Sequence, residues 1–152
     1  MRNIGDTIDR LRREGLSART WGYRGDEAVE RLERGLDLSL GPGLREFVVE
    51  AGNLMVAPFE VVLGGDDAGR YSAVTQSRAL WKFRPALGTS KAIQLMDHAG
   101  QVYLYFPHDG HVRAYDALRP VPGEEVSAWG TFDQFVEWVI AEARGIAQAP
   151  GS

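Results

Sequence analysis

The segment that decides the fold is residues 91–116, KAIQLMDHAGQVYLYFPHDGHVRAYD. It contains three short apolar runs separated by two polar turns, and each turn ends in glycine. The middle run, residues 102–106, consists of aromatic and branched residues, which favour a pleated and largely buried strand. The segment therefore predicts a three-stranded meander, on which the other elements pack.

Helical periodicity flanks this meander. Apolar residues recur at spacings of three and four in residues 3–14, 26–37 and 42–51, and Pro42 suits the first position of its helix. The clearest pattern begins at Thr131, which forms a capping box with Gln134 before a long apolar stripe. Residues 59–63 indicate one more strand, residues 17–25 a loop, and residues 72–83 either a short helix or irregular structure. The glycine-rich residues 64–69 indicate a turn-rich loop, because they lack the Lys-Ser/Thr of a phosphate loop.

Length and composition indicate one globular domain, and the helix and strand patterns described above favour the α+β class. The chain has 152 residues, of which 44% are hydrophobic and 25% charged, as in ordinary globular proteins. We expect a single domain over residues 1–146, with a mostly antiparallel sheet packed by N-terminal helices and a C-terminal helix, and a flexible tail at 147–152. No signal peptide, membrane span or cysteine is found, so we expect a cytoplasmic protein without disulfides or thiolate metal sites.

Acidic residues are concentrated in the C-terminal third. Residues 97–142 hold eight Asp or Glu but only two basic residues, Arg113 and Arg119. Such a surface repels nucleic acid and anionic membranes, and it attracts a basic protein. The charge pattern therefore predicts a protein partner and argues against nucleic-acid or membrane binding.

Three motifs resemble those of the SUKH superfamily of Smi/Knr-type and Syd-like proteins. The first is a helix at residues 42–53, PGLREFVVEAGN, preceded by the acidic helix from Asp26 to Leu36. The second is the meander with its Asp-Gly turn, and the third is the closing helix that begins TFDQFVEW at Thr131. The resemblance covers residues 26–144.

The resemblance implies a fold and a class of function. The implied fold has helices packed on a mostly antiparallel sheet. Bacterial members are mostly immunity proteins that bind and neutralise a toxin, often a nuclease or deaminase, and others are regulators or adaptors. The resemblance therefore implies a non-enzymatic protein without a cofactor, and together with the acidic C-terminal third it leads us to expect that this protein occludes a cognate, basic, nuclease-type toxin.

The candidate partner-binding residues are aromatic or acidic. If the turn at residues 97–100 is a four-residue loop, Leu95 pairs with Val102 and Ile93 with Leu104, which leaves Tyr103 and Tyr105 on the opposite face. Tyrosines on an open sheet face are favoured interface anchors, but a helix covering this face is an equal alternative. Trp129 and Trp138 raise the same question of core or interface. The candidate set is Tyr103, Tyr105, Asp97, Asp109, Asp116, Glu124 and Glu125.

The three histidines give a rival interpretation. His98, His108 and His111 lie among aspartates in the two turns, and imidazole with carboxylate suits zinc or manganese. Asp109-Gly110 is also a strong hairpin signal, and this alone explains the polar residues beside it. We therefore expect no metal site and no enzyme. A regulatory adaptor and a metal-dependent enzyme or small-ligand binder remain the alternative functions.

Overall fold

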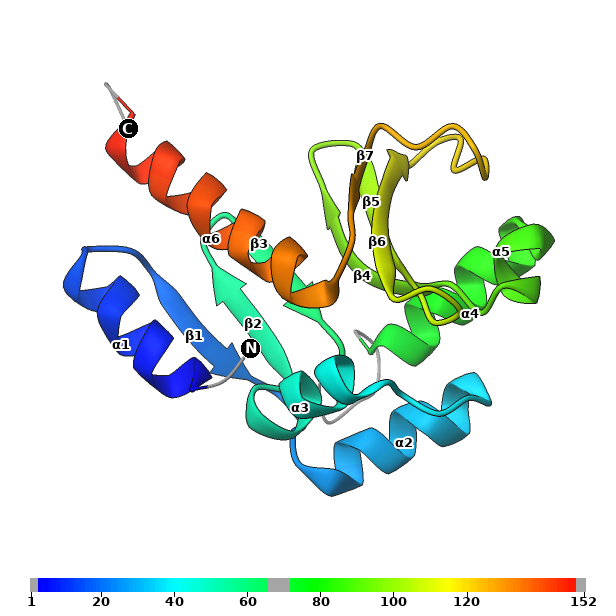
Figure 1. Ribbon diagram of the computed structural model, residues 1–152, viewed down its shortest axis with the longest axis horizontal. Helices are drawn as coiled ribbons and strands as arrows, with labels where there is room; N and C mark the ends of the chain where they lie inside the picture. Colours follow the sequence, from blue (N-terminus) through cyan, green and yellow to red (C-terminus); the bar gives the residue numbers. More distant parts are fainter. Residues whose placement is uncertain (1–2, 66–71, 150–152) are drawn as a thin grey trace.

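The computed structural model describes residues 3–65 and 72–149, and within these ranges it contains six helices and two antiparallel sheets. The α+β fold class is therefore confirmed (Figure 1). No helix in these ranges has the length and apolar character needed to cross a bilayer. In chain order the elements are α1 (Ile4–Arg13), β1 (Ala18–Trp21), α2 (Asp26–Leu36), α3 (Pro42–Glu50), β2 (Asn53–Val56), β3 (Phe59–Val62), α4 (Ala73–Phe83), α5 (Pro85–Thr89), β4 (Ile93–His98), β5 (Gln101–Phe106), β6 (His111–Asp116), β7 (Ser127–Trp129) and α6 (Phe132–Gln148).

The predicted meander is the centre of the larger sheet. Strands β4, β5 and β6 pair antiparallel in sequence order, and β7 adds a fourth strand beside β6. The smaller sheet has the order β1-β2-β3. Among the residues that the structure describes, no strand pairing joins the two sheets, although β3 and β4 are neighbours.

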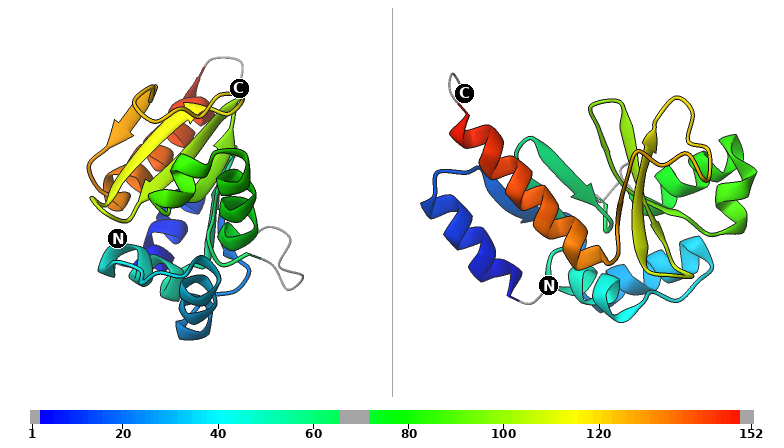
Figure 2. Two further views of the ribbon diagram at one scale, coloured as in Figure 1. Left: turned by 90° about the vertical axis from the view of Figure 1, so that its right-hand side faces the viewer. Right: turned by 45° about the horizontal axis from the view of Figure 1, so that its top comes forward.

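Helices cover both faces of the four-stranded sheet. Helix α6 packs on one face and contacts β6 and β7, as well as β2 of the smaller sheet. Helices α4 and α5 lie on the opposite face, as the left view of Figure 2 shows. The apolar side chains form two clusters accordingly, a large one around α6 and a small one between β5, β6 and α5.

The register of the meander differs from the expected one. The first turn has two residues, Ala99 and Gly100, both with positive φ, so that His98 pairs with Gln101. A bulge between Gln94 and Met96 then shifts the register again. As a result Ile93 pairs with Tyr105, and the predicted pairing of Ile93 with Leu104 is wrong.

Sequence patterns predicted one of the short strands, at residues 59–63, and missed others. The predicted loop at residues 17–25 contains β1, and the strand expected at 59–63 is half of a hairpin with β2. The ambiguous residues 72–83 form α4, whose first turn is capped by Ser72 accepting a hydrogen bond from the Thr75 amide at 3.2 Å. Helix α6 includes Ala147 and Gln148 of the expected tail. Residues 150–152 of that tail, and 66–69 of the predicted loop, lie outside the described ranges.

A buried asparagine fixes the smaller sheet. Gly52 has the positive φ expected at the end of α3, whereas Asn53 begins β2 and is 0% exposed. Its Nδ2 donates to the carbonyl oxygens of Trp21 at 3.0 Å and Gly65 at 3.1 Å. Its Oδ1 accepts from the amides of Leu63 at 2.9 Å and Gly65 at 3.0 Å. One side chain thus bonds four backbone groups, one from edge strand β1 and three from the segment that follows β3.

Candidate functional site

Four of the candidate acidic residues lie at one end of the four-stranded sheet. Asp97 pairs with Val102 near the end of the pairing between β4 and β5. Asp116 is the last residue of β6 and pairs with Gln101. The Val126 amide bonds the Ala114 carbonyl at 2.9 Å, which brings the preceding glutamates back to the same end. We call this group the acidic end; it consists of Asp97, Asp116, Glu124 and Glu125.

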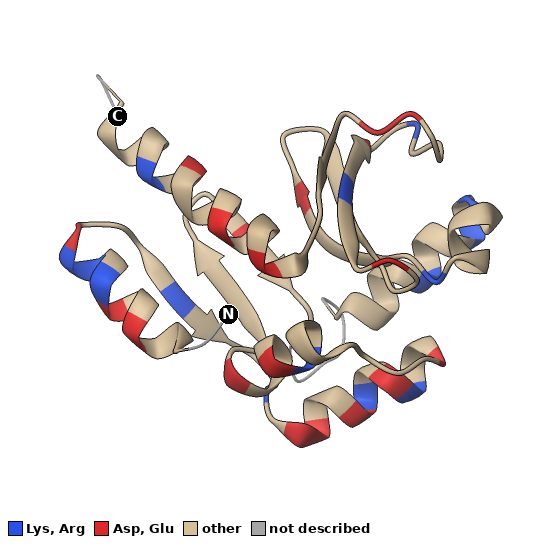
Figure 3. Ribbon diagram, viewed as in Figure 1, with Lys and Arg blue, Asp and Glu red and all other residues tan. Residues whose placement is uncertain are grey.

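The acidic end is exposed and uncompensated. All four residues are solvent-exposed, and none makes an ion pair within residues 3–65 and 72–149. Helix α6 contains a further acidic residue, Glu142. The pKa of the Tyr103 hydroxyl is raised mainly by burial and, to a smaller extent, by the charge of Glu142. Figure 3 shows acidic segments on β4, α6 and the β6–β7 loop. The one basic residue of that loop, Arg119, is also exposed.

The two candidate tyrosines are part of the core. Tyr103 is 3% exposed and Tyr105 8%, because α6 covers their face of the sheet. Tyr103 packs against Trp129 and Trp138, with ring centroids 5.8 Å away in each case. The prediction that the tyrosines lie on an open face of the sheet is therefore wrong, and the alternative, that a helix covers this face, is confirmed. The two tryptophans likewise pack, partly buried, against the core.

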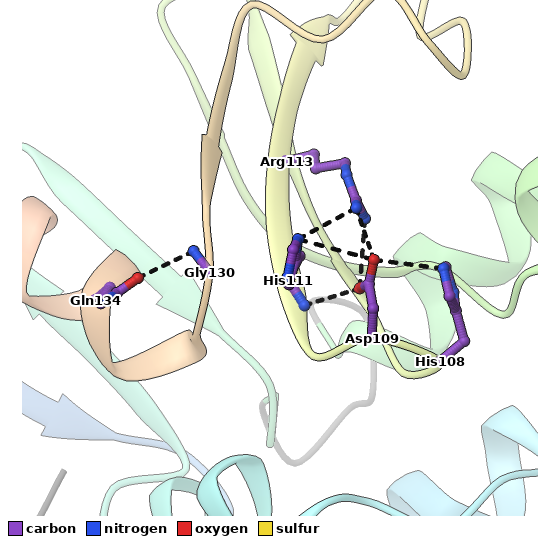
Figure 4. Close-up of polar contacts among 6 residues, drawn as sticks. All are labelled: His108, Asp109, His111, Arg113, Gly130 and Gln134. Carbon is purple, nitrogen blue, oxygen red and sulfur yellow. Dashed lines mark hydrogen bonds and ion pairs between the residues drawn. The ribbon is translucent and has the colours of Figure 1, made fainter.

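Asp109 lies at the opposite end of the sheet, in the turn between β5 and β6. Its Oδ2 is 2.6 Å from Nη2 of Arg113, and its Oδ1 accepts a bond from the His111 amide at 2.9 Å. His108 Nε2 is 3.4 Å from Oδ2 on the other side (Figure 4). Asp109 is thus separated from the acidic end, and its carboxylate stabilises this turn and binds the Arg113 guanidinium.

The charge of Asp109 is stabilised by these contacts. Partial burial acts to raise the pKa of its carboxyl group, but the hydrogen bonds from Arg113 and from the His111 amide outweigh burial and lower this pKa to about 2. Asp109 therefore remains a carboxylate throughout the neutral range. The guanidinium of Arg113 stays paired with it.

A cleft connects the Asp109 turn with the acidic end. It has a volume of about 330 Å³ and lies between α5, the outer face of β5 and β6, and the β6–β7 loop. Aromatic rings form much of its wall, with the Phe106 and Tyr115 centroids 6.3 Å apart. Besides these two aromatic residues, the cleft is lined by the charged or imidazole side chains of His108, Arg113 and Glu125. The other lining residues are Ala86, Ser90, Pro122 and Gly123.

The predicted histidine set is not assembled. His98 lies at the acidic end and packs on Phe59 with ring centroids 4.4 Å apart, whereas His108 and His111 flank Asp109 at the other end. No group of three or more potential metal ligands occurs among the described residues. The pairing of the strands thus places His98 at one end of the sheet and the other two histidines at the opposite end, although the three are close in sequence.

Sequence reasoning missed Phe106, Arg113 and Tyr115 as site residues. Arg113 and Tyr115 alternate along β6 on the face opposite α6, and the Arg113 guanidinium lies 4.9 Å from the Phe106 ring centroid. This alternation after the Asp-Gly turn was a readable signal for a shared face. It could not show that α5 and the β6–β7 loop would wall that face.

Comparison with known proteins gives no family assignment. The chain matches no model of a known protein family and no curated protein. The resemblance to the SUKH superfamily stays a prediction from the sequence motifs.

Proposed function

We propose that this protein is a bacterial immunity protein that binds a basic, nuclease-type toxin and blocks its active site. The observation that carries the proposal is the acidic end, where Asp97, Asp116, Glu124 and Glu125 are exposed without an ion-pair partner in the described parts of the chain. Carboxylates gathered in this way from separate strands and a loop form a patch that a basic surface would complement.

The proposed mechanism is electrostatic steering followed by occlusion. Exposed charges accelerate the encounter with an oppositely charged partner, and this acceleration weakens as salt screens them. A nuclease binds a polyanion, so its active site carries positive charge that an acidic surface can cover. The bound inhibitor excludes substrate both by its bulk and by its negative charge.

The direct test is to look for a neighbouring reading frame that encodes a nuclease-like toxin domain and to co-express this protein with that domain. We expect restored growth and a stable complex in size-exclusion chromatography, with an association rate that falls steeply with salt. Persistent toxicity together with the absence of a complex would rule the proposal out. A complex with a cellular protein that is not toxic would instead favour the adaptor alternative.

Charge neutralisation locates the binding surface. The variant Asp97→Asn/Asp116→Asn/Glu124→Gln/Glu125→Gln should associate at least about tenfold more slowly at low salt and show a weaker salt dependence. The matched control Asp6→Asn/Asp26→Asn/Glu30→Gln/Glu50→Gln removes the same charge from exposed positions in α1, α2 and α3 that form no ion pair among the described residues. If the control slows association as much as the first variant, the acidic end is not the binding surface.

A further inference from the structure

The loop between β6 and β7 carries an apolar side chain that is almost fully exposed. Leu118 is 87% exposed and Val126 54%, and they are two of the four large hydrophobic side chains that are exposed in the described parts of the chain. The loop consists only of residues 117–126, so these side chains are concentrated in it (Figure 1). With so little of its surface buried, Leu118 contributes almost nothing to the hydrophobic stabilisation of the folded protein.

The backbone around Leu118 is nevertheless fixed. The Ala117 amide donates to the Gly100 carbonyl oxygen and the Leu118 amide donates to Asp116 Oδ1, both at 2.9 Å. Ala117 packs, partly buried, against the smaller apolar cluster, and Pro120 is buried. Leu118 thus lies between two residues that pack on the protein. A side chain presented from such an ordered backbone loses less conformational entropy on binding than one in a mobile loop.

The charges around Leu118 indicate what kind of partner it meets. The loop and the residue before it contain three acids, Asp116, Glu124 and Glu125, and one basic residue, Arg119. Protein interfaces commonly surround a buried apolar anchor with a polar or charged rim. The acidic end supplies such a rim, and a basic protein surface complements it. The same carboxylates repel an anionic membrane or a nucleic acid.

We propose that Leu118 is the apolar anchor of the partner interface and enters an apolar socket on the basic toxin domain, with Lys and Arg side chains around that socket facing the acidic end. This inference rests on the proposed function, since it adds a second kind of contact to the same surface. The two kinds of contact act on different rates. Exposed charges mainly set the association rate, whereas a desolvated apolar anchor mainly sets the dissociation rate.

The unbound protein provides the first test. Leu118→Ala should leave the midpoint of urea unfolding unchanged, because the side chain buries little surface in the folded protein. A midpoint clearly below that of the wild type would show that Leu118 packs within the protein, and the inference would be overturned.

The dissociation rate of the toxin complex provides the second test, measured by surface plasmon resonance at several salt concentrations. Leu118→Ala should dissociate about thirtyfold faster, because it removes a side chain whose burial takes apolar surface out of water. Its association rate and salt dependence should stay close to those of the wild type. Leu118→Met keeps an apolar side chain and should stay within about threefold of the wild-type dissociation rate.

Two further variants test whether apolar character at this position is required. Leu118→Asn keeps a branched side chain but makes it polar, and it should dissociate at least as fast as Leu118→Ala. The control Ile146→Ala removes another exposed aliphatic side chain, in α6, and should change neither rate more than about twofold.

The pattern of rates separates this inference from the proposed function. If the complex forms and Leu118→Ala dissociates at the wild-type rate, or if Ile146→Ala dissociates as fast as Leu118→Ala, the inference is overturned and the proposed function stands. If no complex forms with the toxin domain, both are overturned. Faster dissociation of Leu118→Ala and Leu118→Asn, together with slower association of the charge-neutralised variant of the acidic end, would support both.

Discussion

Replacing Asn53 with alanine should lower the free energy of unfolding strongly, although it removes few atoms. In Asn53→Ala, the backbone carbonyls of Trp21 and Gly65 each lose the bond from the Asn53 side chain, and the amides of Leu63 and Gly65 lose their acceptor. The site is fully buried, so water does not replace the lost partners without rearrangement. The Leu63 and Gly65 amides are therefore left without an acceptor inside the folded protein, whereas the Gly65 carbonyl keeps its bond from the Tyr23 amide at 3.1 Å.

The magnitude follows from the number of hydrogen bonds. Four bonds at a net contribution of about 1 kcal/mol each predict a loss of about 4 kcal/mol in the free energy of unfolding. This is a large part of the roughly 5–15 kcal/mol available to a typical domain. The variant should fold only in stabilising conditions, or should unfold at a much lower urea concentration than the wild type.

Urea unfolding monitored by tryptophan fluorescence measures this loss. Asn53→Asp is an informative companion, because it keeps the two accepted bonds but places a buried charge beside two carbonyl oxygens; its loss should be at least as large at neutral pH. Gln148→Ala serves as the control, because Gln148 is exposed in the last turn of α6, and it should change stability by less than about 0.5 kcal/mol. A loss below about 1 kcal/mol for Asn53→Ala would refute the reasoning.

Two further predictions concern Asp109 and Tyr103. Because the pKa of Asp109 is lowered to about 2 in the folded state, its contribution to stability is present above pH 4 and disappears as the pH falls toward 2. Asp109→Asn should therefore be about 1 kcal/mol less stable than wild type at pH 7, allowing for solvent screening, and equally stable near pH 2; a pH-independent difference in urea titrations would contradict this. Tyr103→Phe removes only the bond to Gln101 Oε1 at 3.1 Å and should cost about 1 kcal/mol, whereas Tyr103→Ala should cost about 3–5 kcal/mol. Neither the fold nor the burial of Tyr103 predicts a binding role, so a tenfold loss of partner affinity in Tyr103→Phe would argue against its assignment to the core.

The meander and α6 could be predicted because their signals are local. Turn residues bounded the strands, and Thr131 with Gln134 marked the start of the helix, where the Gln134 amide bonds the Thr131 hydroxyl oxygen at 3.1 Å. Strand β1 has four residues and pairs with residues 53–56, more than thirty positions away. No local pattern encodes such a distant pairing. The two-residue turn was missed because it places Ala99 at φ 51°, which an alanine rarely adopts.

The candidate site was predictable in composition but not in arrangement. The acidic excess was visible in the sequence, yet only the register shows that Asp97 and Asp116 share one end of the sheet while Asp109 lies at the other. The tyrosines were misplaced because the burial of a face depends on where α6 packs. The cleft requires α5 and the β6–β7 loop to meet β6, and these tertiary contacts have no signature in the residues themselves.

The position of α6 between the two sheets has a consequence for how the molecule comes apart. In the described part of the chain, strand pairing does not connect the sheets, and α6 contacts elements of both, through β2 on one side and β6 and β7 on the other. Peeling α6 away from its C-terminal end would remove the shared support of both sheets and uncover Phe135 and Trp138 together with their partner Tyr103. We expect amide protons of both sheets to exchange with the same free energy of opening, so that the two sheets behave as one folding unit despite having separate hydrogen-bond networks.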